Sequence, residues 1–141
     1  MLESTVLSRS PEDTERAGEA LGRTLKRGDI VLLSGPLGSG KTVLVRGLAR
    51  ALGVTETVTS PSFLIVSEYE GAPPLVHVDL YRLQSPEELE NLGLRDITSE
   101  TAVTVVEWGE RAADLLPPDC LRVSIEIRGA ETRLISMRRR P

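Results

Sequence analysis

The sequence is poor in several residue types, and each shortage excludes a class of protein. Cys120 is the only cysteine, so no internal disulfide can form and we expect a protein of the reducing cytoplasm. No apolar run reaches the length of about 18 residues that a membrane-spanning helix needs, so we expect no membrane contact. The net charge of −4 argues against direct binding to DNA or RNA, because phosphate neutralisation requires clustered basic residues. The one basic run lies in residues 138–141, which we predict to be a solvated C-terminal tail.

Lysine is also scarce, and the position of one lysine is informative. The chain contains only Lys26 and Lys41, and Lys41 lies in a segment that matches the phosphate-loop motif G-x-x-x-x-G-K-[ST] at every fixed position. Backbone N–H groups of such a loop point at phosphate oxygens, the lysine reaches the β- and γ-phosphates, and the threonine hydroxyl binds Mg²⁺. The predicted nucleotide-binding residues of this loop are Gly35, Pro36, Leu37, Gly38, Ser39, Gly40, Lys41 and Thr42.

The order of the predicted elements favours an α/β fold. We expect one helix from its N-cap Ser10 to about Gly28, a buried strand at residues 29–34, and a second helix from Lys41 to Gly53. A strand–loop–helix unit followed by several strands implies a single three-layer domain with a mixed sheet. Further strands are predicted at residues 63–68, 75–79, 102–107, 121–127 and 133–137, with a hairpin around Gly129 and short helices at residues 86–91 and 109–116.

Two acidic residues, Asp79 and Glu107, each end an apolar run and are candidates to complete the site. Bound Mg²⁺ and the attacking water need an acidic group at the tip of a neighbouring strand. One acid should hold Mg²⁺ while the other orients the water, and the spacing does not separate these roles. His77 should project to the same side of its strand as Asp79, and we expect it to support the site through a hydrogen bond. Trp108 is either a core residue or a rim residue beside the nucleotide.

Several families of nucleotide-binding proteins are excluded by missing motifs. The guanine-reading motif N-K-x-D cannot form, because the only asparagine, Asn91, is followed by Leu92. The L-S-G-G-Q segment of ABC ATPases is absent, and 141 residues leave no room for the helical lid of an AAA+ motor. Gln84 is the only glutamine and no D-x-x-G surrounds it, so a carboxylate is the simpler group to position the water. A compact ATPase or a small kinase remains.

Four motifs taken together resemble those of one known family. The phosphate loop is followed by S-P-S-F at residues 60–63, by H-V-D-L-Y-R at residues 77–82 and by V-E-W at residues 106–108. In order and spacing these motifs resemble the TsaE (YjeE) family, the ATPases of bacterial tRNA threonylcarbamoyladenosine synthesis. Pro36, where the family usually has aspartate, and Ser62, where it usually has threonine, are departures that remove no phosphate or metal group.

The resemblance implies a P-loop NTPase fold with a mixed, roughly seven-stranded sheet, and ATP and Mg²⁺ as ligands. It implies that Thr42 and Glu107 bind Mg²⁺, and that residues 59–63 form a switch-like segment near the γ-phosphate. The catalytic residues that it implies are Asp79, Lys41 and Glu107. The residues that it implies near the adenine are Ser10, Pro11, Thr14 and Arg133.

The resemblance also implies a partner, a protein complex of TsaB–TsaD type that modifies tRNA at position 37. Contact with tRNA would then be indirect, and ATP hydrolysis would be slow in the isolated chain and regulated by the partner. Two alternatives stay open. In a small-molecule kinase, Asp79 would deprotonate an acceptor hydroxyl and arginines such as Arg82 or Arg95 would hold the acceptor. In a regulatory subunit, nucleotide would bind with negligible turnover.

Overall fold

The computed structural model describes residues 2–59, 66–80, 100–108 and 119–139. The predicted helices at residues 86–91 and 109–116, the segment 60–63, and Arg82 and Arg95 lie outside this part of the chain. The elements of the described residues are β1 (Leu2–Ser8), α1 (Pro11–Gly22), β2 (Ile30–Ser34), α2 (Lys41–Ala51), β3 (Val66–Tyr69), β4 (Leu75–Asp79), β5 (Val103–Glu107), β6 (Leu121–Ile127) and β7 (Arg133–Arg139). None of these helices is long and apolar enough to cross a membrane.

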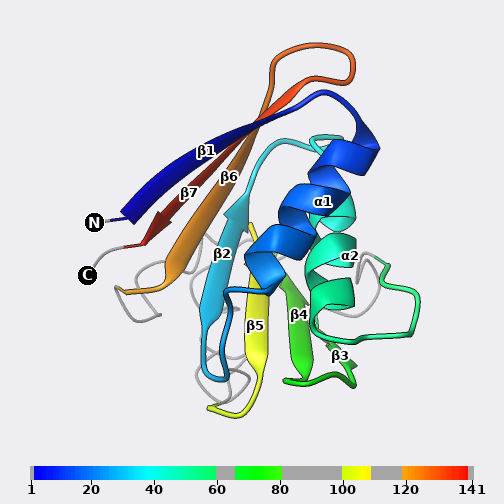
Figure 1. Cartoon of the computed structure of the whole chain (residues 1–141), viewed down its shortest axis with the longest axis vertical. Coiled ribbons are helices and arrows are strands. Elements are labelled where there is room, and N and C mark those ends of the chain that lie inside the picture. The colour runs from blue at the N-terminus through cyan, green and yellow to red at the C-terminus, as the bar shows by residue number, and fades with distance from the viewer. Residues whose placement is uncertain (1, 60–65, 81–99, 109–118, 140–141) are drawn as a thin grey trace.

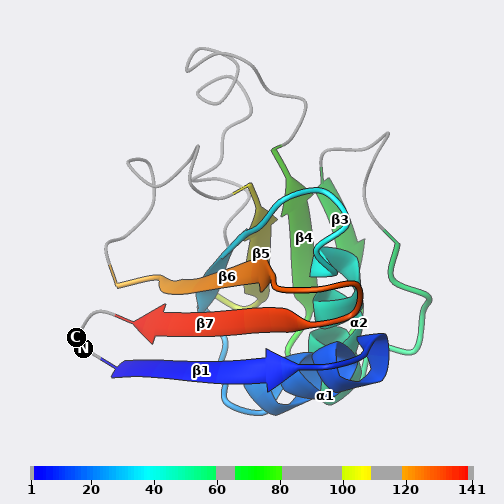
Figure 2. The same ribbon diagram turned by 90° about the horizontal axis from the view of Figure 1, so that it is seen from above.

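All of these strands belong to one seven-stranded sheet in the order β1-β7-β6-β2-β5-β4-β3. Strands β6, β2, β5 and β4 run parallel, whereas β7 is antiparallel to both β1 and β6, and β3 is antiparallel to β4. Figure 2 shows that the sheet is strongly twisted, so that β1 and β7 run across the direction of β3 and β4. The predicted α/β fold with a mixed sheet is confirmed.

Helices α1 and α2 pack side by side on one face of the sheet (Figure 1). Their contact depends on glycines, because a Cβ atom on Gly18 would lie 2.0 Å from the carbonyl oxygen of Leu44, and one on Gly47 would lie 1.9 Å from that of Glu15. No larger residue fits at either position without moving a helix. The two helices can therefore approach closely, and the start of α1 comes near the phosphate loop.

The central strands are buried on both faces. In β2, Val31 and Leu33 join the core beneath the two helices, whereas Leu32 joins a second apolar cluster on the opposite face. Strands β4 and β5 follow the same alternation, and continuous burial of this kind is typical of parallel strands covered on both sides. The helices predicted for the second face fall on residues outside the described ranges, so the third layer stays a prediction.

The predicted basic tail is wrong for its first two residues. Arg138 and Arg139 lie in β7, which pairs with β1 along its whole length. Arg138 forms an ion pair with Glu3 across this pair of strands, at 3.2 Å, and Arg139 forms one with Asp29 at 3.6 Å. The sequence at this end of β7 is a run of consecutive arginines without apolar residues between them, so the run resembled a solvated tail.

Two boundaries near the N-terminus also differ from the prediction. Helix α1 ends at Gly22, not near Gly28, and its C-cap Arg23 donates its backbone N–H to the carbonyl oxygens of Glu19 and Leu21. Leu25 is buried in the turn that follows, so it continues the apolar spacing of the helix without being helical. Strand β1 carries mainly exposed side chains, which is why no apolar alternation marked it as a strand.

Candidate nucleotide-binding site

The phosphate loop connects the end of β2 to the start of α2 at the middle of the sheet. Gly40 is the N-cap of α2 and has a φ of 102°, a left-handed conformation that glycine adopts at no steric cost. Glycine has no side chain to cap the helix, so the first N–H groups of α2 remain available to a ligand. This arrangement is a ready-made anion site, because the positive end of the helix dipole points the same way.

The Lys41 side chain is buried inside this loop. Its Nζ donates to the carbonyl oxygens of Gly35 and Pro36, at 2.5 and 3.2 Å, and lies 4.2 Å from the ring centroid of Trp108. Trp108 also packs against the second apolar cluster, as expected of a core residue, and its alternative position beside the nucleotide stays a prediction. The protein thus holds one positive charge at the centre of the loop, between carbonyl oxygens and the face of an indole ring.

Asp79 and Glu107 lie next to each other at the carboxyl ends of β4 and β5, where they are paired in register. Glu107 is also in register with Leu33 of β2, one residue before the end of the strand that leads into the phosphate loop. The next residue, Trp108, donates its backbone N–H to the carbonyl oxygen of Leu33 at 2.9 Å. The structure therefore brings both candidate acids to the edge of the sheet that carries the phosphate loop.

His77 forms the supporting hydrogen bond that the sequence predicts. Its Nε2 lies 2.6 Å from Oε2 of Glu107, and both side chains are buried. A carboxylate only accepts hydrogen bonds, so Nε2 carries the proton and donates it. This contact fixes the orientation of the Glu107 carboxylate and leaves Oε1 for another partner.

The residues predicted to bind Mg²⁺ provide a suitable set of donors. Thr42 lies in the first turn of α2 and supplies a hydroxyl, and Glu107 supplies a carboxylate held by His77. Magnesium takes oxygen ligands and keeps several waters, so it needs few protein groups when phosphates are present. The described residues contain no group of three or more His, Cys, Asp or Glu side chains placed to hold a metal.

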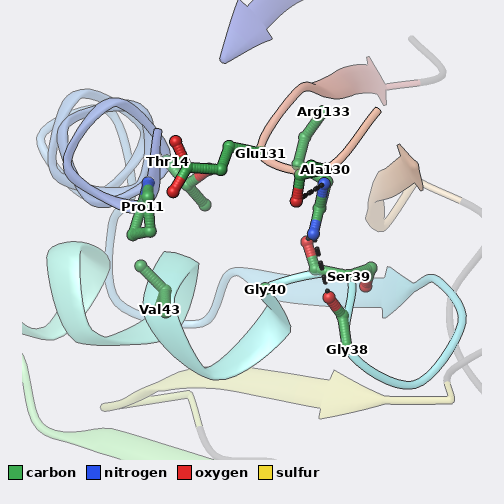
Figure 3. Close-up of a pocket in the computed structure, with 9 residues that line it drawn as sticks. All are labelled: Pro11, Thr14, Gly38, Ser39, Gly40, Val43, Ala130, Glu131 and Arg133. Carbon is green, nitrogen blue, oxygen red and sulfur yellow. Dashed lines mark hydrogen bonds between the residues drawn. The ribbon is translucent and has the colours of Figure 1, made fainter. Parts of the chain in front are cut away.

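A cavity of about 250 Å³ opens beside the phosphate loop, between the start of α1 and the turn that joins β6 to β7 (Figure 3). It brings together Pro11, Thr14 and Arg133, three of the residues expected near the adenine. Ser10 does not line it. The complete lining is Pro11, Thr14, Gly38, Ser39, Gly40, Val43, Ala130, Glu131 and Arg133.

Arg133 lines this cavity and also supports its walls, while its expected position near the adenine stays a prediction. Its guanidinium donates to the carbonyl oxygens of Ser39 at 3.0 Å and Gly38 at 3.2 Å in the phosphate loop. It also donates to those of Gly129 at 2.9 Å and Thr132 at 3.0 Å in the β6–β7 turn. Arg133 therefore fastens the turn to the phosphate loop, a contact that its position within a predicted strand could not reveal.

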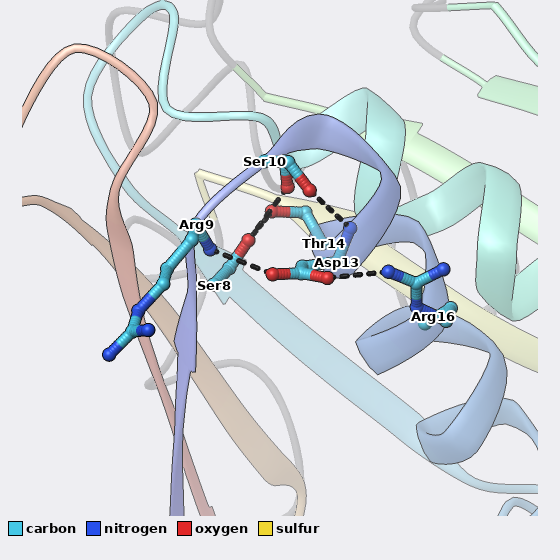
Figure 4. A network of polar contacts seen from close by, with 6 residues as sticks. All are labelled: Ser8, Arg9, Ser10, Asp13, Thr14 and Arg16. Carbon is cyan, nitrogen blue, oxygen red and sulfur yellow. Dashed lines mark hydrogen bonds and ion pairs between the residues drawn. The ribbon is translucent and has the colours of Figure 1, made fainter.

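The start of α1 forms the opposite wall and is fixed by a network of polar contacts (Figure 4). Ser10 accepts from the backbone N–H of Asp13 at 3.1 Å, and Asp13 accepts from that of Arg9 at 3.1 Å. The Ser8 hydroxyl donates to the carbonyl oxygen of Ser10 at 2.8 Å, so in the 2.7 Å contact between the Ser8 and Thr14 hydroxyls it is Thr14 that donates. This wall is therefore held in place before any ligand binds.

Three residues of the cavity were not predicted from the sequence: Val43, Ala130 and Glu131. Val43 directly follows the phosphate-loop motif, and the other two belong to the turn after Gly129 that was predicted only as a hairpin connection. They could have been predicted from their positions in the sequence, because each lies within three residues of Thr42 or Arg133, which were already expected near the nucleotide.

Comparisons with known proteins show the family of this chain. The family model described as "Threonylcarbamoyl adenosine biosynthesis protein TsaE" matches residues 8–135. The tRNA threonylcarbamoyladenosine biosynthesis protein TsaE of Treponema pallidum is 43% identical over 121 residues, covering 86% of this chain and 90% of that protein. The protein of the same name from Streptomyces coelicolor is 48% identical over 113 residues, covering 77% of this chain and 76% of that protein.

A solved structure gives the same result for the fold. The crystal structure of Bacillus subtilis YdiB matches this chain with a TM-score of 0.82 and 31% sequence identity, covering 96% of this chain and 84% of that one. The family model and the sequence relatives extend over most of the chain, and the residues that the family model matches include the phosphate loop and both candidate acids. The chain therefore belongs to the TsaE family of threonylcarbamoyladenosine biosynthesis proteins.

Proposed function

We propose that this protein is an Mg²⁺-dependent ATPase that supports tRNA threonylcarbamoyladenosine synthesis through a partner complex of TsaB–TsaD type. One observation carries the proposal: the buried Lys41 ammonium lies in a glycine-rich loop at the edge of the sheet where Asp79 and Glu107 also end their strands. Family membership supports the pathway, because the related proteins are named for threonylcarbamoyladenosine biosynthesis.

The loop accounts for binding of the triphosphate. In the structure, Lys41 Nζ is held by the carbonyl oxygens of Gly35 and Pro36, which are neutral acceptors. Phosphate oxygens are charged acceptors and form stronger hydrogen bonds, so a bound triphosphate would attract the ammonium at little cost. Ser39 Oγ is also buried in this loop without a hydrogen-bond partner among the described residues, and unsatisfied groups of this kind are frequent at functional sites.

The two acids account for hydrolysis. Glu107 is buried and oriented by His77, so it is suited to a fixed ligand role together with the Thr42 hydroxyl. Bound Mg²⁺ would supply charge stabilisation for the phosphates. Asp79 lies beside Glu107 and is partly exposed, so it can accept a hydrogen bond from a water molecule and orient it. The structure supports this division of roles, which the spacing of the two acids left open.

A partner that covers the phosphate loop would regulate the activity. Leu37 lies at the tip of the loop and is 66% exposed, and Pro36 beside it is exposed as well. Exposed apolar groups at a functional edge favour contact with another protein. We therefore expect slow hydrolysis by the isolated chain and a different rate in the complex.

Phosphate release measured with and without the partner complex tests the proposal. We expect release from Mg·ATP that is slow for the chain alone, changes when the complex is added, and is abolished by Lys41→Ala. Lys26→Ala is the matched control, because Lys26 is the only other lysine and is exposed away from the loop. A phosphorylated metabolite as the product would favour the kinase alternative, and nucleotide binding without turnover under any condition would favour the regulatory subunit.

A further inference from the structure

The turn between β6 and β7 carries a carboxylate to which the proposed ATPase mechanism assigns no role. Glu131 lines the cavity beside the phosphate loop, and Figure 3 shows its side chain extending from the turn toward Pro11 and Thr14 of α1. We propose that Glu131 determines nucleoside specificity by accepting hydrogen bonds from donor groups of the bound nucleotide. The donors would be the ribose hydroxyls or an amino group of the base. This inference rests on the proposed function and deepens it.

The first argument is that Glu131 is held at this position by its neighbours. Arg133 donates to the carbonyl oxygens of Gly129 and Thr132 on either side of it and to those of Gly38 and Ser39 in the phosphate loop. The turn is therefore fixed relative to the loop that would hold the phosphates. A carboxylate mounted on it faces the nucleoside part of a ligand at a defined place.

The second argument is that the other polar side chains of the cavity, apart from Ser39 in the phosphate loop, are already engaged. The guanidinium of Arg133 donates to main-chain carbonyl oxygens, and the Thr14 hydroxyl donates to that of Ser8. The methyl group of Thr14 lies near Gly40, since a Cβ atom on that glycine would be 3.7 Å from Thr14 Cγ2. Within the described residues, no hydrogen bond or ion pair engages the Glu131 carboxylate. Glu131 is thus the side chain of the cavity best placed to accept hydrogen bonds from donor groups of a ligand.

The third argument comes from charge. A carboxylate close to a bound triphosphate raises the free energy of binding through repulsion, although solvent screens part of this effect at an exposed residue. The repulsion is offset where the carboxylate accepts hydrogen bonds from neutral donors of the same ligand, and hydrogen bonds to charged groups are the stronger kind. A nucleoside offers such donors and an inorganic polyphosphate does not. Glu131 should therefore favour nucleotides over free polyphosphate.

Binding measurements with matched probes test this inference. For Glu131→Ala we expect Mg·ATP to bind about tenfold more weakly than to the wild type, because a charge-assisted hydrogen bond is lost. Binding of magnesium tripolyphosphate, which has no nucleoside, should stay the same or become tighter. The matched control is Glu126→Ala, which removes the same charge from the same hairpin at an exposed residue outside the cavity. Thermal unfolding of each variant confirms that it is folded.

Two analogues identify the donor. If Glu131 accepts from the ribose, the wild type binds 2′,3′-dideoxyATP, which lacks both ribose hydroxyls, more weakly than ATP, and Glu131→Ala removes this difference. If it accepts from the base, the same pattern appears with purine riboside triphosphate, which lacks the amino group. The inference is overturned if Glu131→Ala binds ATP like the wild type, if it weakens ATP and tripolyphosphate equally, or if neither analogue discriminates. Failure of the wild-type protein to bind Mg·ATP at all would instead overturn the proposed function.

Discussion

The central strands β2, β5 and β4 are buried on both faces, whereas β6 alternates buried with exposed side chains and β1 is exposed along most of its length. The phosphate loop and the two acids belong to the buried centre, and the cavity beside the loop is closed by the turn between β6 and β7. Rigid, close-packed strands suit groups that must be placed accurately for chemistry. The hairpin of β6 and β7 packs one face into the core through Val123, Ile125 and Ile135, and its turn can contribute recognition at the cavity.

The largest expected effect concerns the chemistry of the centre. Asp79→Ala should reduce phosphate release from Mg·ATP by at least about 100-fold, because a group that orients the attacking water is lost. The Kd for Mg·ATP should change by only a few-fold, since the residue lies beside the phosphates without belonging to the loop. Single-turnover kinetics and calorimetry measure the two quantities separately. The matched control is Asp119→Ala, because Asp119 is exposed. Hydrolysis by Asp79→Ala at the wild-type rate would show that Asp79 does not orient the attacking water.

The same substitution placed in each region tests the difference in packing. Val105 of β5 is 0% exposed and Val6 of β1 is 38% exposed. Val105→Ala should lower the free energy of unfolding by about 2–3 kcal/mol, because two buried methyl groups are lost and a cavity remains. Val6→Ala should cost less than about 0.5 kcal/mol. Denaturant unfolding of both variants measures the difference, and equal losses would contradict the contrast between the two regions.

Arg133 joins the two regions, so its removal should have an intermediate effect. Arg133→Ala removes the hydrogen bonds to Gly38 and Ser39, and we expect it to lower the free energy of unfolding by about 1–2 kcal/mol. Affinity for Mg·ATP should fall as well, because the loop loses its support. Arg128→Ala is the control, since Arg128 forms only an exposed pair with Glu126 and should contribute little. If both variants behave alike, Arg133 does not hold the loop.

The smallest effect is expected at the start of α1, where pH is the variable. Hydrogen bonds from the Arg16 side chain and from the Arg9 backbone lower the pKa of Asp13 below its ordinary value. Because the pKa of this carboxyl is lower in the folded chain than in the unfolded chain, its ionised form stabilises the folded state at pH values above the unfolded-state pKa. This stabilisation is lost as the pH falls through the folded-state pKa. Asp13→Asn should therefore be slightly less stable than the wild type at neutral pH and equal to it in strong acid. Thermal unfolding across this pH range measures the difference in stability between Asp13→Asn and the wild type, with Glu70→Gln as an exposed control. A difference that did not change with pH would contradict a stabilising role of the Asp13 carboxylate.

The buried centre could be predicted from the sequence, because its signals are local. Strands β2, β4 and β5 are short apolar runs, and the phosphate loop combines glycines and a lysine at a spacing that few other structures require. His77 was placed beside the acids by strand alternation alone, and the structure shows the hydrogen bond to Glu107. Apart from that hydrogen bond, which joins residues 30 positions apart, these features depend on neighbours within a few residues of one another in the chain.

The rest depends on contacts between distant residues, and it could not be predicted from local pattern. Gly18 and Gly47 are needed because two helices touch, which their surroundings in the sequence do not reveal. Arg133 reaches carbonyl oxygens of residues 94 and 95 positions away in the chain. Strand β1 is fixed by its pairing with β7, and its exposed side chains leave no apolar pattern. Long-range pairing and close helix contact therefore define the walls of the cavity beside the phosphate loop.

Calorimetric titration with Mg·ATP tests the central claim, that the glycine loop and the Lys41 ammonium bind a triphosphate. The wild type and Lys26→Ala should show saturable heat with one nucleotide per chain, and Lys41→Ala should show no saturation under the same conditions. Absence of saturable binding by the wild type at millimolar Mg·ATP, or wild-type affinity in Lys41→Ala, would contradict the account.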